Sequence, residues 1–107
     1  MIVYICHPYS ADPEGNTAKV RAIAQRLKDA GHMPWAPHLY LPQLYDEATE
    51  REAAMDFCLE MVSRCDVLLM PNEDVQATAG VVAEVAVAGA EGVPRLTLDQ
   101  LLGEARR

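Results

Sequence analysis

Hydrophobic residues occur along the chain in short runs that are separated by segments rich in turn-forming residues. Four runs have the length and the β-branched or aromatic content of strands, and they cover residues 1–6, 33–36, 66–70 and 93–98. The runs MIVYIC and DVLLM show almost no alternation with polar residues, which is typical of strands buried between two layers.

Amphipathic stretches between these runs predict helices. Residues 16–31 carry apolar side chains at intervals of three and four, with Asn16 as the expected N-cap and Gly31 as the expected left-handed stop. A second helix is predicted over residues 46–64 and a terminal helix over residues 99–107.

The remaining segments complete an alternating order of elements. Residues 78–91 are almost wholly apolar and predict a third helix, with Thr78 as its N-cap, whereas the proline-rich residues 37–45 predict an extended loop. Strand and helix then alternate four times. This order predicts one α/β domain over residues 1–107, with a parallel sheet and helices on both of its faces.

A sheet of this kind binds ligands at the carboxyl ends of its strands. Three segments follow the first three strands and are expected to meet there. They are HPYS at residues 7–10, APHLY at residues 36–40 and PNEDVQATAG at residues 71–80.

Glu84 is the only charged residue between Thr78 and Ala90. Helical side chains lean toward the N-terminus of their helix, so Glu84 is expected to lie over Gly80, with open space where Gly80 lacks a side chain. An unpaired carboxylate among apolar residues is costly or has a raised pKa, and such groups concentrate at functional sites. Free N–H groups at the helix start also favour an anion there.

Two structural explanations for Glu84 stay open. Glu84 can pair with an arginine, including one across a subunit interface. Alternatively, it can belong to a thin solvated face of the helix, together with Ala77, Gly80, Ala88 and Glu91.

Composition excludes several classes of function. The net charge is −7 with no compensating basic cluster, which excludes a nucleic-acid partner held by phosphate contacts. No apolar run approaches the ~20 residues that a membrane span requires, and the N-terminus lacks the basic region of a signal peptide. Cys6, Cys58 and Cys65 show no C-x-x-C spacing, so we expect reduced thiols and a cytoplasmic location.

Four segments, in this order, carry a resemblance to a known family: VYICHPYS, PHLYLP, REAAMDFCLEMVSRCDVLLM and TAGVVAEVAVAGAEGVP. The chain resembles the nucleoside 2-deoxyribosyltransferase-like superfamily over roughly residues 2–96, and most closely a small branch of unknown function from bacteria and phages. The most specific part is T-x-G-x-x-x-E, from Thr78 to Glu84. The resemblance implies a three-layer, flavodoxin-like or Rossmann-like parallel sheet of four to five strands.

The resemblance also implies a reaction and a site. The glutamate that matches Glu84 attacks the anomeric carbon of a deoxyribose, the base departs, and water or a second base resolves the glycosyl-enzyme ester, with no metal or cofactor. The space at Gly80 would hold the sugar, and a serine matching Thr78 binds a 5′-phosphate in some members. The implied lining from the first loop is His7, Tyr9 and Ser10.

One departure from the family pattern bears on catalysis. Catalytic members carry an aspartate eight residues before the one that matches Asp66, and Cys58 stands there in this chain. A thiol is a poor substitute for a carboxylic acid that assists the leaving base. Either another acid such as Asp46 serves, or this branch binds its ligand without the reaction.

Other side chains are weaker candidates. Arg51 either pairs with a neighbouring glutamate or contacts a substrate phosphate or Glu84, and His38 is a candidate ligand contact. A zinc site built from Cys6, His7 and His38 lacks ligand spacing and is not favoured. Three aromatic residues near the proline-rich loop either stack on a base or fill a shallow core: Trp35, Tyr40 and Tyr45.

The sequence therefore supports two functions of different classes, with a small-molecule nucleoside or nucleotide as the partner. The first is a transferase or hydrolase of deoxynucleoside N-glycosidic bonds with Glu84 as nucleophile; the second is a nucleotide-binding domain without turnover. NAD glycohydrolysis is a less favoured third. The apolar third helix and the small number of strands also predict a homo-oligomer.

Overall fold

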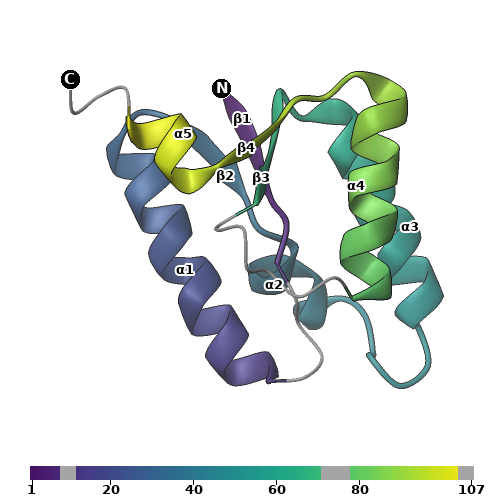
Figure 1. The fold of residues 1–107 in the computed structure, drawn as a ribbon. Helices are drawn as coiled ribbons and strands as arrows, with labels where there is room; N and C mark the ends of the chain where they lie inside the picture. The colour runs from purple at the N-terminus through teal and green to yellow at the C-terminus, as the bar shows by residue number, and fades with distance from the viewer. Residues whose placement is uncertain (8–11, 71–77, 104–107) are drawn as a thin grey trace.

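The computed structural model describes residues 1–7, 12–70 and 78–103 of the 107-residue chain. It contains a sheet with helices beside it (Figure 1). The sheet has four strands in the order β2-β1-β3-β4, and every neighbouring pair of strands is parallel. The strands are β1 (Ile2–Ile5), β2 (Met33–Trp35), β3 (Val67–Met70) and β4 (Arg95–Thr97). The predicted α/β fold with a parallel sheet is confirmed.

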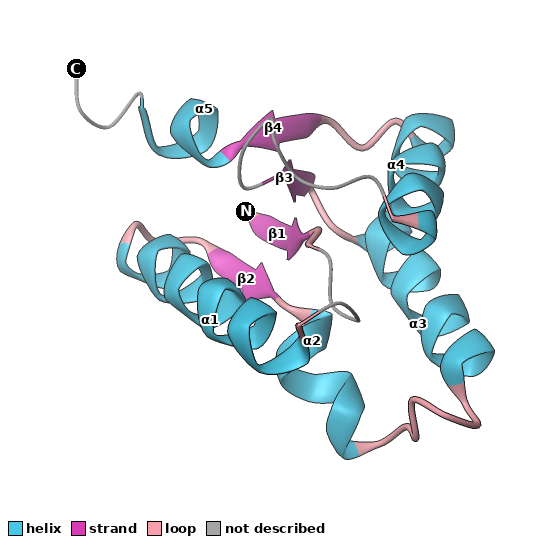
Figure 2. Ribbon diagram, turned by 60° about the horizontal axis from the view of Figure 1, so that its bottom comes forward, coloured by secondary structure: helices cyan, strands magenta, loops and turns pink. Residues whose placement is uncertain are grey.

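Helices cover both faces of the sheet, as the alternation of elements predicted (Figure 2). Helix α1 (Pro13–Asp29) and helix α5 (Leu98–Gly103) pack on one face. Helix α3 (Arg51–Arg64) and helix α4 (Ala79–Glu91) pack on the other face and against each other. The molecule therefore has three layers.

The alternating side chains of β1 supply both cores. Val3 and Ile5 face α1 and α5, whereas Tyr4 and Cys6 face α3 and α4. Successive strand residues point to opposite faces of a sheet, so an unbroken apolar strand buries one set on each side. All four side chains are at most 1% exposed.

The order of the strands fixes where a ligand can bind. From the central β1 the chain crosses to β2 on one side and later returns to β3 on the other, so the carboxyl ends of β1 and β3 flank a topological switch point. Asp66, which precedes β3, accepts a hydrogen bond of 2.8 Å from the Ile2 backbone N–H and so ties the start of β3 to β1.

Helix α1 begins earlier than predicted. Its N-cap is Asp12, whose carboxylate accepts a 3.2 Å hydrogen bond from the Gly15 backbone N–H, and Pro13 is its first residue. Asn16, the predicted N-cap, is instead buried in the first turn. An N-capping aspartate followed by proline is the stronger start signal, because proline lacks the N–H that a first helical turn leaves unpaired. Gly31 has φ +91°, as its predicted role as a stop requires.

The proline-rich segment is more ordered than the predicted extended loop. It forms a short helix α2 (Pro37–Tyr40) and a 3-10 turn η1 (Leu41–Gln43), each with proline in its first turn. Asp46 does not begin α3 as predicted; its carboxylate accepts a 2.8 Å hydrogen bond from the Ala48 N–H in a turn, and α3 starts at Arg51.

Helix α4 matches its prediction closely. Thr78 caps it by accepting a 3.3 Å hydrogen bond from the Val81 N–H, and Gly92 ends it at φ 72°. Its outer face is uncharged and exposed; Val82 there is 55% exposed. Self-association through this face stays a prediction. Within residues 1–7, 12–70 and 78–103, no helix has both the length and the apolarity needed to cross a bilayer.

Candidate functional site

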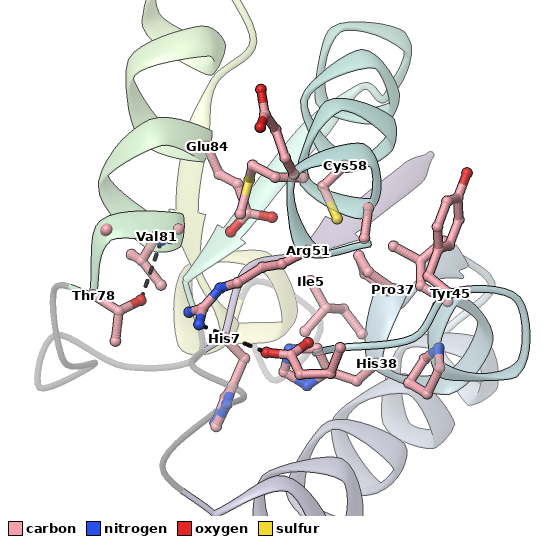
Figure 3. A pocket seen from close by; sticks show the side chains of 18 of the residues that line it. Ile5, His7, Pro37, His38, Tyr45, Arg51, Cys58, Thr78, Val81 and Glu84 are labelled. Carbon is pink, nitrogen blue, oxygen red and sulfur yellow. Dashed lines mark hydrogen bonds and ion pairs between the residues drawn. The ribbon is translucent and has the colours of Figure 1, made fainter. Parts of the chain in front are cut away.

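A cavity of about 860 Å³ lies at the carboxyl ends of the strands. His7 follows β1, Pro37 and His38 follow β2, and the first turn of α4 follows the segment after β3; all of them line it. The N-terminal half of α3 closes the remaining side. The described residues of the three segments that were expected to meet after the first three strands thus border one space (Figure 3).

Most of the candidate site residues predicted from the sequence line this cavity. They are His7, His38, Arg51, Thr78, Gly80 and Glu84. Tyr9 and Ser10 lie outside the described residues.

Glu84 is buried on the inner face of α4, with 7% of its surface exposed. The Tyr4 hydroxyl donates a hydrogen bond to its Oε2, and the Cys6 thiol donates to its Oε1 across 3.5 Å. Both donors come from β1 and its carboxyl end. Glu84 therefore does not lie on a solvated face, and its hydrogen bonds within the described residues come from a phenol and a thiol rather than an arginine.

Burial dominates the ionisation of this cluster. It raises the pKa of Glu84, while the hydrogen bonds from Tyr4 and Cys6 act in the opposite direction. Burial, followed by the charge of Glu84, raises the pKa values of Tyr4 and Cys6 as well. Both groups therefore remain protonated donors at neutral pH, so the carboxylate is the member of the cluster that ionises first.

Cys58 lies on α3 and faces the same cavity as Glu84 (Figure 3). It is buried, and desolvation raises its pKa to about 11. The thiol is therefore neutral at physiological pH and holds its proton too tightly to act as an efficient acid. The position where the family resemblance implies a carboxylic acid carries a group that does not transfer a proton readily.

The space near Gly80 is bounded by α3. A Cβ built at Gly80 would lie 3.0 Å from Cε of Met55. The absence of a side chain at Gly80 therefore makes room for Met55 and not only for a ligand. The predicted hollow directly over Gly80 is thus narrower than expected. The cavity continues beside it along Glu84 and Cys58.

Arg51 lies at the start of α3, on the wall of the cavity. Its Nη1 lies 3.9 Å from Oε1 of Glu47, and the Arg51 side chain is 71% exposed. The ion pair with a neighbouring glutamate, one of the two roles expected for Arg51, is therefore present. Two more carboxylates, Asp46 and Glu52, line the cavity on the same side.

His7 and His38 meet edge to face, with ring centroids 5.9 Å apart. Burial, together with the nearby His7, lowers the pKa of His38 to about 4, so its imidazole is neutral in the cavity. Cys6 directs its thiol toward Glu84 on the α3–α4 side. Across the described ranges 1–7, 12–70 and 78–103, no cluster of three metal-ligating side chains forms.

The aromatic residues near the proline-rich segment pack mainly on one another. Trp35, Tyr40 and Tyr45 surround Phe57 at centroid distances of 6.1, 6.2 and 6.3 Å. Of these four, only Tyr45 lines the cavity. The cluster therefore braces the wall formed by α2 and η1, and Tyr45 remains available to contact a ligand.

Sequence reasoning missed the two donors to Glu84. Tyr4 and Cys6 alternate along a strand that was recognised as buried, so they necessarily share one face of the sheet. A buried tyrosine normally needs a hydrogen-bond partner for its hydroxyl. That need, together with one isolated acid on a helix predicted to cover the sheet, was the available signal.

Comparisons with other proteins agree with this architecture. A family model described as "Domain of unknown function (DUF7768)" matches residues 1–97. A search of curated proteins found no match.

Two solved structures resemble the chain in fold. One is the 2-deoxyribosyltransferase of the psychrotolerant bacterium Bacillus psychrosaccharolyticus, with a TM-score of 0.70 and 22% identity over 91% of this chain and 71% of that one. Another is a 2-deoxyribosyltransferase from Leishmania mexicana, with a TM-score of 0.62 and 21% identity over 90% of this chain and 62% of that one. The chain thus spans less than two thirds of the Leishmania protein. The flavodoxin-like fold that the sequence resemblance implied is confirmed.

Proposed function

We propose that this chain, which belongs to the family described as "Domain of unknown function (DUF7768)", cleaves or transfers the N-glycosidic bond of a 2′-deoxynucleoside or its 5′-monophosphate. The observation that carries the proposal is the buried carboxylate of Glu84 on the wall of a cavity large enough for a nucleoside. A buried acid with a raised pKa beside an open cavity is uncommon outside functional sites.

Glu84 would act as the nucleophile. A carboxylate oxygen attacks C1′ of the sugar, the bond from C1′ to the base nitrogen breaks, and the sugar becomes esterified to Glu84. Water or a second base then attacks C1′ and releases the carboxylate, so the configuration at C1′ is retained over two displacements. Tyr4 and Cys6 hold the two carboxylate oxygens and stabilise their negative charge at the start and end of the cycle.

The other lining residues would position the substrate. The sugar would lie by Gly80 at the start of α4, where backbone N–H groups of the first turn are directed toward the cavity end of the helix. We propose Thr78 and Arg51 as contacts to the 5′-phosphate of a nucleotide substrate. His7 and His38 would line the site, with Tyr9 and Ser10 from the first loop. The fold likeness to two 2-deoxyribosyltransferases supports this substrate class.

A second function has one observation in its favour. Cys58 faces the cavity where a carboxylic acid would assist the departing base, and its raised pKa makes it a poor acid. A chain that binds nucleosides or nucleotides without turnover would tolerate this residue. In that case Glu84 would hydrogen-bond the ligand instead of attacking it.

One experiment separates the two functions. The protein is incubated with a panel of 2′-deoxynucleosides, their 5′-monophosphates and NAD, and free base is measured by mass spectrometry. Base release that disappears in Glu84→Gln and persists in Glu91→Gln, an exposed acid on the same helix, supports the enzyme. Thermal stabilisation by a ligand without base release supports the binding domain. If no member of the panel releases a base or stabilises the protein, both functions are refuted.

A further inference from the structure

The departing base presents a chemical problem in this cavity. When a neutral base leaves C1′, it takes the bonding electron pair and needs a proton, which a positioned acid normally supplies. The side chain that faces the cavity from α3 near Glu84 is Cys58, a buried thiol that is neutral and weakly acidic. The Tyr4 hydroxyl, whose pKa burial also raises, is already engaged with Glu84.

The other carboxyl groups on the described cavity wall are placed to act as anions. Glu47 pairs with Arg51, and the Asp46 carboxylate accepts a hydrogen bond from the Ala48 N–H. Glu52 is exposed in the first turn of α3, where the helix dipole favours its negative form. These three carboxylates therefore present negative charge to the cavity and attract positive charge in a ligand.

The balance of charge on the described wall is negative. Four carboxylates line it, from Asp46, Glu47, Glu52 and Glu84, against the single guanidinium of Arg51. The start of α4 contributes only about half a positive charge. His38 stays neutral above about pH 4. A cavity whose walls carry mainly one sign of charge concentrates ligands of the opposite sign.

Resting on the proposed N-glycoside chemistry, we propose that the substrate is an N-glycoside of a cationic base, in which the nitrogen bonded to C1′ belongs to a positively charged heteroaromatic ring. Attack by Glu84 on C1′ forms the ester bond and breaks the C1′–nitrogen bond. The electron pair goes to the ring nitrogen, which becomes neutral, and the base leaves without a proton. Water then attacks C1′, the sugar is released, Glu84 returns as a carboxylate, and the proton of the water passes to solvent.

This substrate class accounts for two independent features together. A base that is positively charged becomes neutral when it leaves with the electron pair, so it needs no proton from an acid. This explains why Cys58 can stand at the acid position. The carboxylates of Asp46, Glu47 and Glu52 attract the cation before it reacts. Tyr45 adds an aromatic face, and Met55 adds a polarisable thioether, both of which suit a flat cationic ring.

The turnover test compares nicotinamide 2′-deoxyriboside, a permanent cation, with neutral 2′-deoxynucleosides. Each enzymatic rate of base release is divided by the spontaneous rate in buffer, because the cationic glycoside is intrinsically more labile. We expect the rate enhancement for the cation to exceed that for the neutral nucleosides by about 10²-fold, since general acid catalysis typically contributes ~10²–10⁴-fold. Glu84→Gln should abolish the enhancement for the cation.

A binding test isolates the effect of the positive charge of the ligand on its affinity. The carbon-linked benzamide deoxyriboside has the shape of nicotinamide deoxyriboside but no charge and no cleavable bond. On Glu84→Gln, calorimetry should show the cation binding about tenfold more tightly than this neutral analogue, with the difference decreasing as salt rises. Glu47→Gln and Glu52→Gln should each reduce the difference, while Glu91→Gln, away from the cavity, should not.

Cys58→Asp supplies a third comparison. It should raise turnover of the neutral nucleosides by restoring an acid, and it should not raise turnover of the cation. If this variant does not fold, the wild-type comparisons decide the matter. Neutral nucleosides with an equal, Glu84-dependent rate enhancement would overturn the cationic substrate and leave the proposed function standing. No Glu84-dependent base release from any compound would overturn both.

Discussion

The hydroxyl of Tyr4 donates a hydrogen bond to the carboxylate of Glu84, which lies eighty positions later in the chain. The bond joins the central strand β1 to helix α4 inside the α3–α4 core. It holds the carboxylate in place. It also stabilises the negative form of a group whose burial favours the neutral form.

Tyr4→Phe should therefore weaken both the fold and the proposed reaction. A hydrogen bond to a charged group contributes about 1.5–3 kcal/mol, so we expect a loss of this order in the free energy of unfolding at neutral pH. Because the Tyr4 hydrogen bond lowers the pKa of Glu84, its removal should move the acidic limb of the activity profile to higher pH. Chemical denaturation and a pH profile measure the two effects. Tyr40→Phe, on an exposed tyrosine outside the cavity, should reproduce neither.

Glu84→Gln should stabilise the fold progressively as pH rises. Burial raises the pKa of Glu84 in the folded chain, so unfolding releases a proton at pH values between the unfolded and folded pKa. The wild-type protein therefore loses stability through this group as pH rises above the ordinary glutamate range, and the glutamine variant does not. Urea titrations at several pH values should show the difference in unfolding free energy growing with pH. A constant difference would contradict the raised pKa.

His38 should contribute to acid unfolding. Its pKa falls from 6.5 to about 4 on folding because burial disfavours the imidazolium. The stability that the neutral form provides is complete above about pH 6.5 and is lost as pH falls toward 4. His38→Asn should therefore flatten the decline of melting temperature across this window. His32→Asn, on a histidine outside the cavity, controls for the loss of an imidazole elsewhere.

Two glycines of α4 should respond differently to alanine. A Cβ at Gly89 meets nothing within 4 Å, so Gly89→Ala should gain about 0.5–1 kcal/mol from helix propensity. A Cβ at Gly80 would press on the flexible end of Met55 at 3.0 Å, so Gly80→Ala should gain less and narrow the cavity. Thermal melts with and without ligand test both expectations. Equal ligand-induced shifts in the two variants would show that Gly80 does not border the binding space.

The fold could be predicted from the sequence because its signals are local. Each strand is a short apolar run, Thr78 and Gly92 mark the two ends of α4, and alternation of strand and helix leaves few topologies. The errors came from competing local signals. Asp12 with Pro13 outweighed Asn16 as a helix start, and prolines that were interpreted as loop formers opened α2 and η1.

The site could be predicted only in part because its contacts are distant in sequence. Strand order brought His7, His38 and Thr78 to the same end of the sheet, and the isolated charge singled out Glu84. The partners of Glu84 depend on which helix covers which face of β1, and no local pattern reports that. The reach of Met55 over Gly80 is likewise set by the distance between two helices.

The link between β1 and α4 has a consequence for how the molecule is made. The nucleophile candidate comes from α4 and its two donors come from β1 and its carboxyl end, so no fragment that lacks either element can assemble the cluster. During synthesis β1 must wait until α4 has emerged before its tyrosine and thiol meet their acceptor. A ligand that recognises the finished cavity would therefore report completion of the entire domain.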